Sequence, residues 1–331
     1  MTLTPLAGQV FQAVRGFADH LEWELGDWKE SWGILYYKEA EIEPSSSRAD
    51  SPPVFWHQNR WLEPFCLTFD SIGQAASALR GIQRNWAPVL FTQFRRGALI
   101  SEKLPPLPSK PRPFPWTVPP QPMGSWTLVN PRTLIGSARC SSPFPGGAIA
   151  YIEDKHFPPS RAYLKLWEAL TLCGNRPGPA SRCLDAGASP GGWTWALLRL
   201  GASVLAVDRA PLEARIQALP GLSFIKHDAF TLKPETLGPV DWLFCDAACY
   251  PQRLYGWIEQ WLESGLCTNY VCTLKMQGSA GAGEGFAVSR RFAAIPGSVV
   301  LHLFHNKHEL TWIHTAAARC QEGAGGGAAP A

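Results

Sequence analysis

The sequence lacks the features that mark several classes of protein. No run approaches the roughly 18 uninterrupted apolar residues of a membrane helix, and the first residues lack a basic segment followed by an apolar one, so we expect neither a membrane span nor a signal peptide. None of the nine cysteines forms a CxxC pair, which argues against a disulfide framework or zinc ribbon and favours a reducing, cytoplasmic location. Charged residues are scarce at 17%, but apolar residues reach 46%, so the chain can bury a large core.

Proline and glycine are abundant, at 30 residues each, yet they follow no collagen-like period. Nine of the prolines lie within residues 104–122, which predicts a stiff polyproline II linker rather than an SH3 ligand. Residues 44–53 are predicted to form a flexible loop. The length of 331 residues suits two domains. We expect an N-terminal α+β domain at residues 1–103, followed by the linker at 104–122 and a strand-rich connecting segment at 123–155. An α/β domain is expected at 156–320 and a disordered tail at 321–331.

Charge is distributed unevenly along the N-terminal half. Residues 1–50 carry 4 Lys/Arg and 9 Asp/Glu, whereas residues 51–140 carry 10 Lys/Arg and 3 Asp/Glu. The basic segment also contains aromatic residues, at Phe55, Trp56, Trp61, Trp86, Phe91, Phe94 and Trp116. Cations beside flat rings suit an RNA strand with unstacked bases. The alternative is that the rings belong to the core and the arginines to a solvated surface.

Hydrophobic spacing predicts a mixture of short elements before residue 160. The expected helices lie at 11–25 and 71–83, and the expected strands at 33–37, 89–94, 126–130 and 148–153. After residue 160 the pattern alternates regularly between helices and strands. The expected strands there lie at 183–187, 203–208, 222–228, 241–246, 270–275, 298–304 and 310–315, with helices at 160–173, at 190–199 and through Trp261. This alternation predicts a doubly wound, mostly parallel sheet.

The most specific segment reads Asp-Ala-Gly-Ala-Ser-Pro-Gly-Gly-Trp, at residues 185–193, between a predicted strand and a helix. Gly187 permits a tight turn and the close approach of a ligand. Pro190 is expected in the first turn of the following helix. The dinucleotide fingerprint GxGxxG is not met, because Ser189 stands in place of its second glycine.

Acidic residues end the next two predicted strands. Asp208 is placed to accept hydrogen bonds from a ribose diol, and Asp228 to reach an adenine edge. An adenosyl ligand lying across the carboxyl edge of a sheet needs this succession. The alternative is a glycine turn that only packs a helix, with solvated aspartates.

The loop resembles that of the S-adenosylmethionine-dependent, FtsJ-like ribose 2′-O-methyltransferases, and the resemblance extends over about residues 160–317. The segments PSRAYLKL, GASPGGWTW, AVDRAP, KHDAF, FCDA, TLKM and HEL–TWIH occur in the order of the bacterial RlmM-type enzymes, which methylate a cytidine ribose of 23S ribosomal RNA. The resemblance implies a Rossmann-like methyltransferase fold, S-adenosyl-L-methionine as cofactor, and 23S rRNA or a large-subunit precursor as partner, without DNA or membrane. The implied cofactor residues are Ser160, Asp185, Gly187, Ser189, Pro190, Gly191, Gly192, Trp193, Asp208, Asp228 and Asp246.

Four dispersed residues match the catalytic Lys-Asp-Lys-Glu set of this family: Lys165, Asp246, Lys275 and Glu309. Lys275 is the candidate base, because a ribose hydroxyl must lose its proton as it attacks a methyl group. A lysine is mostly protonated at neutral pH; Lys165 would lower the pKa of Lys275, whereas the two carboxylates would raise it. Each member has a structural alternative, as a solvated lysine, a helix cap or a turn ion pair.

Two other pairs of residues near this set have simpler interpretations. His305 and His308 flank Glu309, but no further ligand cluster accompanies them, so we expect no metal. Cys245 and Cys249 bracket Asp246 and are expected to be small buried residues.

Alternatives to a ribose methyltransferase come from two classes. One is a non-catalytic RNA-binding or ribosome-assembly factor that retains the cofactor pocket. The other is a methyltransferase of another RNA, of a base or of a protein; the absence of an Asn/Asp-Pro-Pro-Tyr/Phe signature, here Asp-Ala-Ala-Cys at 246–249, argues against amino-group chemistry. Residues 14–25 and 124–147 resemble the two ends of the RNA-binding THUMP region, which implies a reduced THUMP or ferredoxin-like element.

Overall fold

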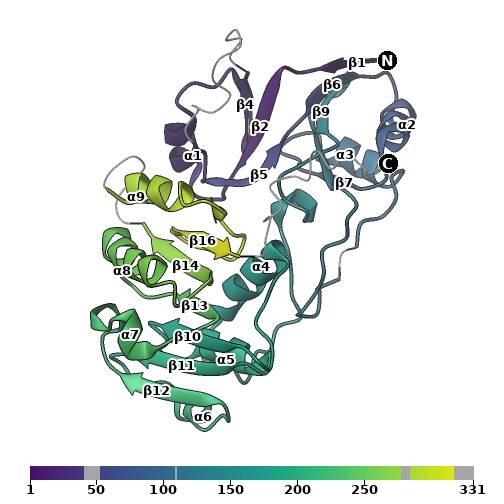
Figure 1. Ribbon diagram of the computed structural model, residues 1–331. Helices are drawn as coiled ribbons and strands as arrows, with labels where there is room; N and C mark the ends of the chain where they lie inside the picture. The colour runs from purple at the N-terminus through teal and green to yellow at the C-terminus, as the bar shows by residue number, and fades with distance from the viewer. Residues whose placement is uncertain (41–52, 109, 277–283, 317–331) are drawn as a thin grey trace, which may run out of the picture. The chain divides into compact units, whose positions relative to one another are not determined.

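The computed structural model describes residues 1–40, 53–108, 110–276 and 284–316 (Figure 1). The chain forms two compact units. The N-terminal unit comprises Met1–Arg112 and Val118–Ala150, and the C-terminal unit comprises Pro113–Thr117 and Tyr151–Cys320. The predicted loop at 44–53, except for its last residue, and the predicted tail at 321–331 lie outside the described residues.

The N-terminal unit contains two sheets. The larger has the order β1-β6-β9-β8-β7 and is antiparallel except for the β7–β8 pair; its strands are β1 (Thr2–Pro5), β6 (Pro64–Thr68), β9 (Thr133–Ser137), β8 (Gly124–Asn130) and β7 (Trp86–Pro88). The smaller, antiparallel sheet has the order β3-β4-β2-β5, with β3 (Glu30–Trp32), β4 (Leu35–Glu39), β2 (Gly8–Ala13) and β5 (His57–Trp61). The helices described in this unit are α1 (Ala18–Leu25), α2 (Ile72–Ile82), α3 (Phe94–Ser101) and the short 3₁₀ turn η1 (Pro145–Gly147).

Helix α2 and the strand at 126–130 are confirmed, whereas other predicted elements of this unit are wrong. Residues 11–13 belong to β2, and the first helix begins only at Ala18. Both faces of β2 are buried in its second half, so the strand lacks the period-2 pattern that would identify it. The strand expected at 89–94 is displaced to β7, which ends at Pro88, and residues 148–153 form no strand.

Most rings of the basic segment are part of the core. Phe55, Trp56, Trp61 and Trp86 are at most 3% exposed, so they cannot stack on RNA. Phe94 differs, at 63% exposed. The alternative that the rings belong to the hydrophobic core is therefore correct for these four buried rings.

The proline-rich segment does not separate the two units. Strands β8 and β9 follow it in the chain, yet they pair with β7 and β6. Residues 118–150 therefore complete the N-terminal unit, and no separate connecting segment exists at 123–155. Pairing between strands far apart in sequence, which composition does not reveal, moves the boundary to residue 150.

The C-terminal unit is built on the predicted doubly wound sheet, which is confirmed. Its order is β12-β11-β10-β13-β14-β16-β15, with parallel pairs from β12 to β14 and antiparallel pairs on both sides of β16. The strands are β10 (Arg182–Ala186), β11 (Ser203–Asp208), β12 (Leu222–Lys226), β13 (Trp242–Cys245), β14 (Asn269–Lys275), β15 (Ser298–Leu301) and β16 (Glu309–Thr315). Every residue of β13 is buried, as expected for a central strand covered on both faces.

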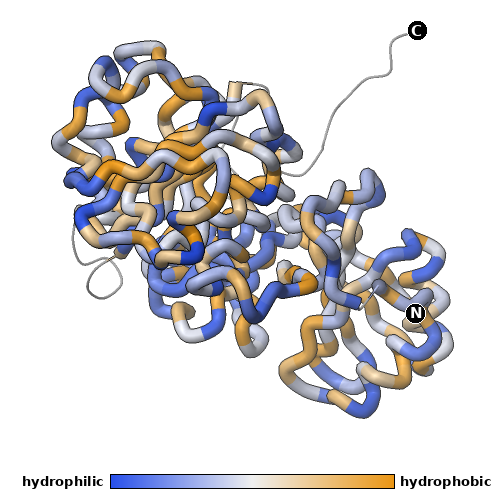
Figure 2. The backbone as a smooth tube through the Cα atoms, turned by 90° about the horizontal axis from the view of Figure 1, so that it is seen from below, coloured by the Kyte–Doolittle hydropathy of each residue, from blue (hydrophilic) through white to orange (hydrophobic). Residues whose placement is uncertain are grey.

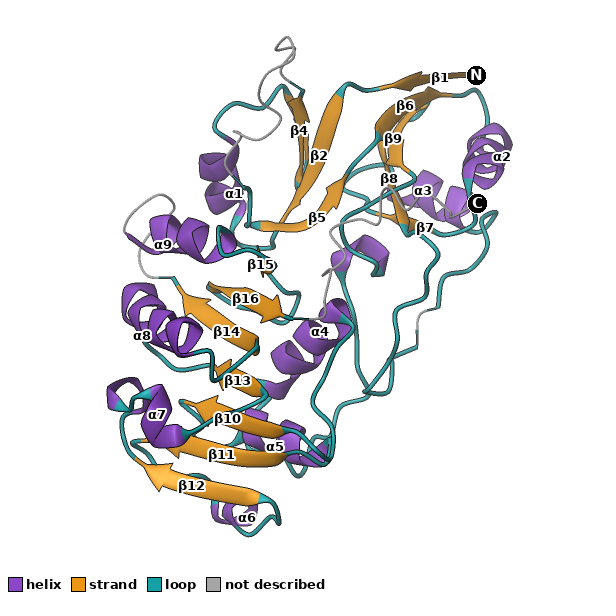
Figure 3. Cartoon of the chain, viewed as in Figure 1, coloured by secondary structure: helices purple, strands orange, loops and turns teal. Residues whose placement is uncertain are grey.

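Helices cover both faces of this sheet (Figure 3). Helix α4 (Tyr163–Cys173) packs on α5 (Gly192–Arg199), while α8 (Pro251–Ser264) packs on α9 (Glu284–Ala293) against β14. Shorter helical segments complete the unit: α6 (Ala214–Gln217), η2 (Ala229–Thr231) and α7 (Pro234–Leu237). Helix α5 begins at Gly192 rather than at Pro190, because Gly191 has a φ of +112°, outside the helical region.

Hydrophobic and hydrophilic residues alternate along the chain in short stretches (Figure 2). In the part of the chain that the structure describes, no helix is long and apolar enough to cross a membrane.

Candidate active site

Two lysines and two carboxylates from separate elements meet at the carboxyl edge of the seven-stranded sheet. Lys165 Nζ lies 2.8 and 2.7 Å from the two carboxylate oxygens of Asp246 and 2.9 Å from Glu309 Oε1. Lys275 Nζ lies 2.6 Å from Asp246 Oδ1 and 2.9 Å from Glu309 Oε2. Each carboxylate thus binds both amines, and the four charges cancel. We call these four residues the tetrad.

The topology of the sheet explains why the tetrad assembles. Asp246 directly follows β13, and Lys275 ends the neighbouring parallel strand β14, so both lie at the same edge. Strand β16 runs antiparallel to β14, and its first residue, Glu309, is the register partner of Lys275. Lys165 comes from the first turn of α4. The residues converge because strand ends meet, not because they are close in sequence.

Burial strengthens these ion pairs. The side chains of Lys165 and Glu309 are each 9% exposed, and that of Lys275 is 22% exposed. Burial alone lowers the pKa of Lys275, but the charges of Asp246 and Glu309 outweigh it and raise this pKa above its usual value. Burial alone raises the pKa of Glu309, but the two lysines outweigh it and lower this pKa to about 2. Lys275 and Glu309 are therefore both charged at neutral pH.

The loop between β10 and α5 has two positions that exclude a side chain. Gly187 has a φ of +76°, and a Cβ there would collide with Ala247. Gly191 also has a positive φ, of +112°. The Ser189 N–H donates to Asp208 Oδ2 at 2.9 Å, which ties the loop to the end of β11. The two glycines therefore let the loop pack closely against Ala247 and Ile216.

Asp208 and Asp228 retain capacity to accept further hydrogen bonds. A carboxylate offers about four acceptor sites. Asp208 uses two of them for backbone N–H groups of the flanking loops. Asp228 accepts from the Phe230 N–H at 3.1 Å and from Arg253 at 2.8 Å; burial raises its pKa, but these two donors outweigh burial and lower it. Both aspartates can accept further donors, as a ribose diol or an adenine amine requires.

Two residues of the predicted cofactor set have buried side chains with partners inside the protein. Asp185 is 1% exposed and accepts from Thr194 Oγ1 at 2.6 Å; burial raises its pKa to about 7 in spite of this bond. Trp193 is 3% exposed and donates to the Ala162 carbonyl at 2.9 Å. These two side chains are enclosed by the protein beside the start of α5.

The other predicted cofactor residues gather around the glycine loop. A Cβ on Gly192 would lie 2.7 Å from Ser160 Oγ, so the segment before α4 lies beside the start of α5. Pro190 is exposed, and its carbonyl accepts the Glu213 N–H at 3.1 Å. The loop, Ser160 and Asp208 thus form one continuous edge.

The sequence analysis missed Thr273. Its hydroxyl donates to Asp246 Oδ1 at 2.7 Å. Thr273 lies two residues before Lys275, and residues two apart in a strand face the same side. That period would have identified it as a neighbour of the tetrad.

The sequence analysis also missed Glu168, which is 2% exposed on α4, three residues after Lys165. Its carboxylate accepts the Phe304 N–H at 2.8 Å, the His305 N–H at 3.1 Å and a hydrogen bond from His305 Nδ1 at 2.7 Å. These bonds tie α4 to the loop that leads into Glu309. Residues three apart on a helix share a face, which was the available signal.

His305, Cys245 and Cys249 lie near the tetrad, and each is partly or fully buried. Among the described residues, no group of three or more potential ligands could hold a metal ion, and His305 bonds to Glu168. Cys245 is buried, and burial raises its pKa well above the usual value. Cys249 is half-buried, and burial raises its pKa to about 11.

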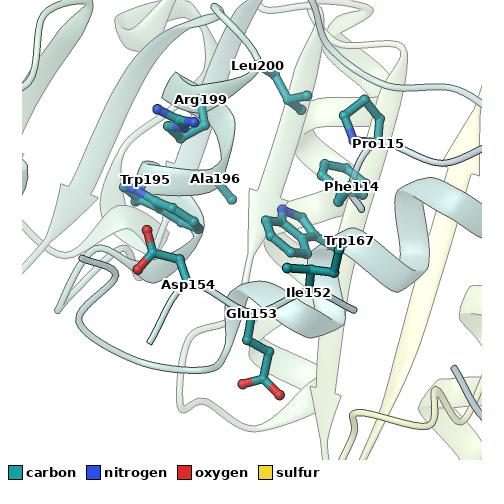
Figure 4. Close-up of a pocket in the computed structure, with 10 residues that line it drawn as sticks. All are labelled: Phe114, Pro115, Ile152, Glu153, Asp154, Trp167, Trp195, Ala196, Arg199 and Leu200. Carbon is teal, nitrogen blue, oxygen red and sulfur yellow. The ribbon is translucent and has the colours of Figure 1, made fainter. Parts of the chain in front are cut away.

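A separate pocket of about 290 Å³ lies at α4 and α5 (Figure 4). Its wall includes Trp195 and the stacked rings of Phe114 and Trp167, whose centroids lie 4.7 Å apart. None of the predicted site residues lines it. The pocket is therefore distinct from the tetrad.

The strand order of the C-terminal unit, with a glycine loop after its first strand, is that of a Rossmann-like methyltransferase fold. Residues 158–320 match the model of the family described as FtsJ-like methyltransferase. This segment of the chain belongs to that family, as its motifs implied.

Three similar proteins carry the name "Ribosomal RNA large subunit methyltransferase M". That of Azoarcus sp. (strain BH72) is 36% identical over 144 residues, which cover 42% of this chain and 38% of the relative. That of Halorhodospira halophila is 40% identical over 121 residues, covering 36% and 35%. That of Xanthomonas oryzae pv. oryzae (strain KACC10331 / KXO85) is 32% identical over 210 residues, covering 61% and 56%. The chain thus spans between 35% and 56% of the length of these relatives.

Proposed function

We propose that this protein transfers a methyl group from S-adenosylmethionine to a ribose 2′-hydroxyl of RNA, with a cytidine of 23S ribosomal RNA as the first candidate. The observation that carries the proposal is the tetrad, in which two carboxylates bind two amines within an FtsJ-like domain. The name shared by the relatives supports large-subunit ribosomal RNA as the substrate.

The edge formed by the glycine loop and the strand-end aspartates fits the proposed cofactor. Gly187 lets the loop pass close to Ala247 at this edge, Asp208 would hold the ribose diol, and Asp228 would hold the adenine. When bound, S-adenosylmethionine supplies a methyl group on a positively charged sulfur.

Lys275 is the proposed general base. The ribose hydroxyl must lose its proton as its oxygen takes the methyl group, and a positioned amine can accept that proton. The raised pKa of Lys275 makes its neutral form a minority at neutral pH. A positive charge brought near Lys275 Nζ, such as that on the sulfur of S-adenosylmethionine, would favour the neutral form of the amine. Lys275 is therefore expected to accept a proton only in the fully assembled site.

The other members of the tetrad position Lys275. Asp246 and Glu309 bind its ammonium from two sides, and Lys165 fixes both carboxylates. Because the base is held in a fixed position, proton transfer from a bound ribose hydroxyl would not require a random encounter between the two groups.

A non-catalytic RNA-binding factor has no need of this arrangement. Removing four charges from water is costly unless their geometry is well satisfied. All four are buried or half-buried, and all are paired. The complete network therefore favours an enzyme.

A cytoplasmic location is part of the proposal. Eight cysteines among the described residues are free thiols, which persist in reducing compartments. Fractionation of cells that express the protein tests the location.

A transfer assay with tritiated S-adenosylmethionine tests the activity. Unmodified ribosomal RNA, transfer RNA and protein are the three acceptors, and nuclease digestion of labelled RNA identifies the nucleoside. We expect label in 2′-O-methylcytidine of large-subunit RNA. Label in transfer RNA or protein alone would contradict the proposed substrate, and absence of label with retained RNA binding would favour the non-catalytic factor.

A further inference from the structure

Three aromatic rings of the C-terminal unit are exposed on loops. Among its described residues they are Phe157, Tyr250 and Phe304, at 37%, 62% and 44% exposed. Tyr250 lies in the loop that begins after β13, and Phe304 lies in the loop between β15 and β16. In the strand order β13-β14-β16-β15, these two loops flank the strands that carry Lys275 and Glu309.

Phe157 differs from the other two rings because its own chain covers it. The Arg215 guanidinium lies 5.9 Å from the ring centroid and donates to the His156 carbonyl at 2.8 Å. In the described part of the chain, the Tyr250 side chain has no hydrogen bond or ring contact, and the Phe304 ring contacts one ring, that of His305, edge-on at 5.2 Å. The faces of Tyr250 and Phe304 are therefore open to a ligand.

Both open rings stand on fixed backbone. The Phe304 N–H donates to the buried carboxylate of Glu168 at 2.8 Å. The Tyr250 carbonyl accepts the N–H groups of Arg253 and Leu254, at 3.0 and 3.2 Å, in the first turn of α8. An aromatic side chain on fixed backbone has only its own few rotations to lose when a ligand stacks on it.

The surroundings of the rings suit a negatively charged strand. Lys307, three residues after Phe304, is exposed and forms no ion pair among the described residues. Cations next to flat rings can bind phosphates and bases together.

We propose that Tyr250 and Phe304 form a stacking site for unpaired bases of the acceptor RNA, on the two sides of the nucleotide whose ribose faces Lys275. The proposal rests on the proposed function, because it names how the acceptor strand is held at that site. Proteins that read single-stranded RNA splay its bases onto aromatic side chains. Two such rings, one on each flank, would present one ribose to the tetrad.

Alanine variants of the two rings test the site. Binding of a fluorescently labelled single-stranded oligocytidylate is followed by anisotropy, and KM and kcat are measured with unmodified 23S rRNA. We expect Tyr250→Ala and Phe304→Ala each to raise Kd and KM about tenfold, since stacking on one ring is worth roughly 5- to 100-fold in affinity. The variants Tyr250→Phe and Phe304→Trp keep a ring and should restore binding.

Two controls isolate stacking from loss of surface or of fold. Ile152→Ala removes an apolar side chain of 60% exposure that lines the pocket away from the tetrad, and it should leave Kd unchanged. The same oligocytidylate annealed to a complementary guanosine strand offers no free base faces along its length, so wild-type protein and both alanine variants should bind it equally. Thermal unfolding reports whether each variant is folded.

The outcomes separate this proposal from the proposed function. If wild-type protein methylates RNA but both alanine variants keep Kd and KM, the stacking site is wrong and the proposed function stands. If wild-type protein transfers no methyl group but the folded alanine variants lose binding to single-stranded RNA, the proposed function is wrong and the stacking site stands. Equal losses in Ile152→Ala would also overturn the stacking site.

Discussion

Lys165 Nζ lies 2.9 Å from Glu309 Oε1, although 144 residues separate them in the chain. The same helix also carries Glu168, whose carboxylate binds the loop that ends at Glu309. Helix α4 thus supplies one member of the tetrad and anchors another. The relative position of the two amines and two carboxylates depends on how this helix docks on β16.

Replacing Glu168 with glutamine should weaken both the fold and turnover. An amide cannot accept all three hydrogen bonds that the buried carboxylate accepts, so we expect the free energy of unfolding to fall by about 1–3 kcal/mol. We also expect kcat to fall while the Kd of the cofactor stays the same, since Glu309 loses its anchor and Asp208 does not. Chemical denaturation and calorimetric titration measure the two effects. Glu235→Gln, at an exposed site, is the control. An unchanged kcat in Glu168→Gln would show that the loop before Glu309 keeps its position without the hydrogen bonds to Glu168.

Lys275→Ala should abolish most methyl transfer. A general base contributes about 10²- to 10⁴-fold, and the remaining amine of Lys165 still balances part of the negative charge. Cofactor affinity, measured by calorimetry, should change little. The exposed Lys233→Ala is the matched control. Unchanged turnover in Lys275→Ala would remove this residue from the mechanism.

The rate of methyl transfer should rise with pH across the neutral range. The carboxylates raise the pKa of Lys275 above its usual value, so the amine is mostly protonated in the neutral range. As long as the pH stays below that pKa, the fraction of neutral amine rises roughly tenfold with each unit of pH. A pH profile of kcat/KM measures the slope, and the residual activity of Lys275→Ala should lack it. A flat profile in the wild-type protein would indicate that proton transfer does not limit the reaction.

Asp208→Asn should weaken binding of the cofactor. The amide keeps one acceptor oxygen but loses the charge that strengthens hydrogen bonds to a ribose diol, so we expect roughly a 10- to 100-fold increase in Kd. Calorimetric titration with S-adenosylmethionine gives this constant. Asp241→Asn, at a strand start on the opposite edge of the sheet, is the control, and equal Kd values for the two variants would argue against the ribose assignment.

The basic surface of α3 gives a prediction for the N-terminal unit. Arg95 is exposed, whereas the Arg96 guanidinium lies 5.7 Å from the Phe69 ring centroid. Arg95→Glu should therefore weaken RNA binding and make it less dependent on salt. The slope of log Kd against the logarithm of the salt concentration should fall by about one for each phosphate that the variant no longer neutralises. Salt-dependent anisotropy measures this slope. The double variant with Arg96→Glu should also lose stability, and indifference of Arg95→Glu would place the RNA surface elsewhere.

Elements of the N-terminal half show where sequence reasoning reaches its limit. Helix α2 was predictable because Ser71 caps it and its apolar residues follow one face. Strand β2 was not, since it is buried on both faces in its second half. The placement of β8 and β9 depends on pairing with β7 and β6 across a long stretch of chain, and no local pattern encodes such pairing.

For the site, the sequence by itself determined the alternation of strands and helices, the glycine loop and the identity of the tetrad, because those features follow from local backbone requirements and from motif residues. Gly187 is one such case, since its positive φ demands a residue without a side chain. Only the tertiary structure decided that the carboxylates outweigh burial in setting the pKa of Lys275. It also decided that Glu168 anchors the loop before Glu309 and that Asp185 is enclosed. Charge balance and burial are sums over neighbours from distant parts of the chain, and those neighbours exist only once the sheet has formed.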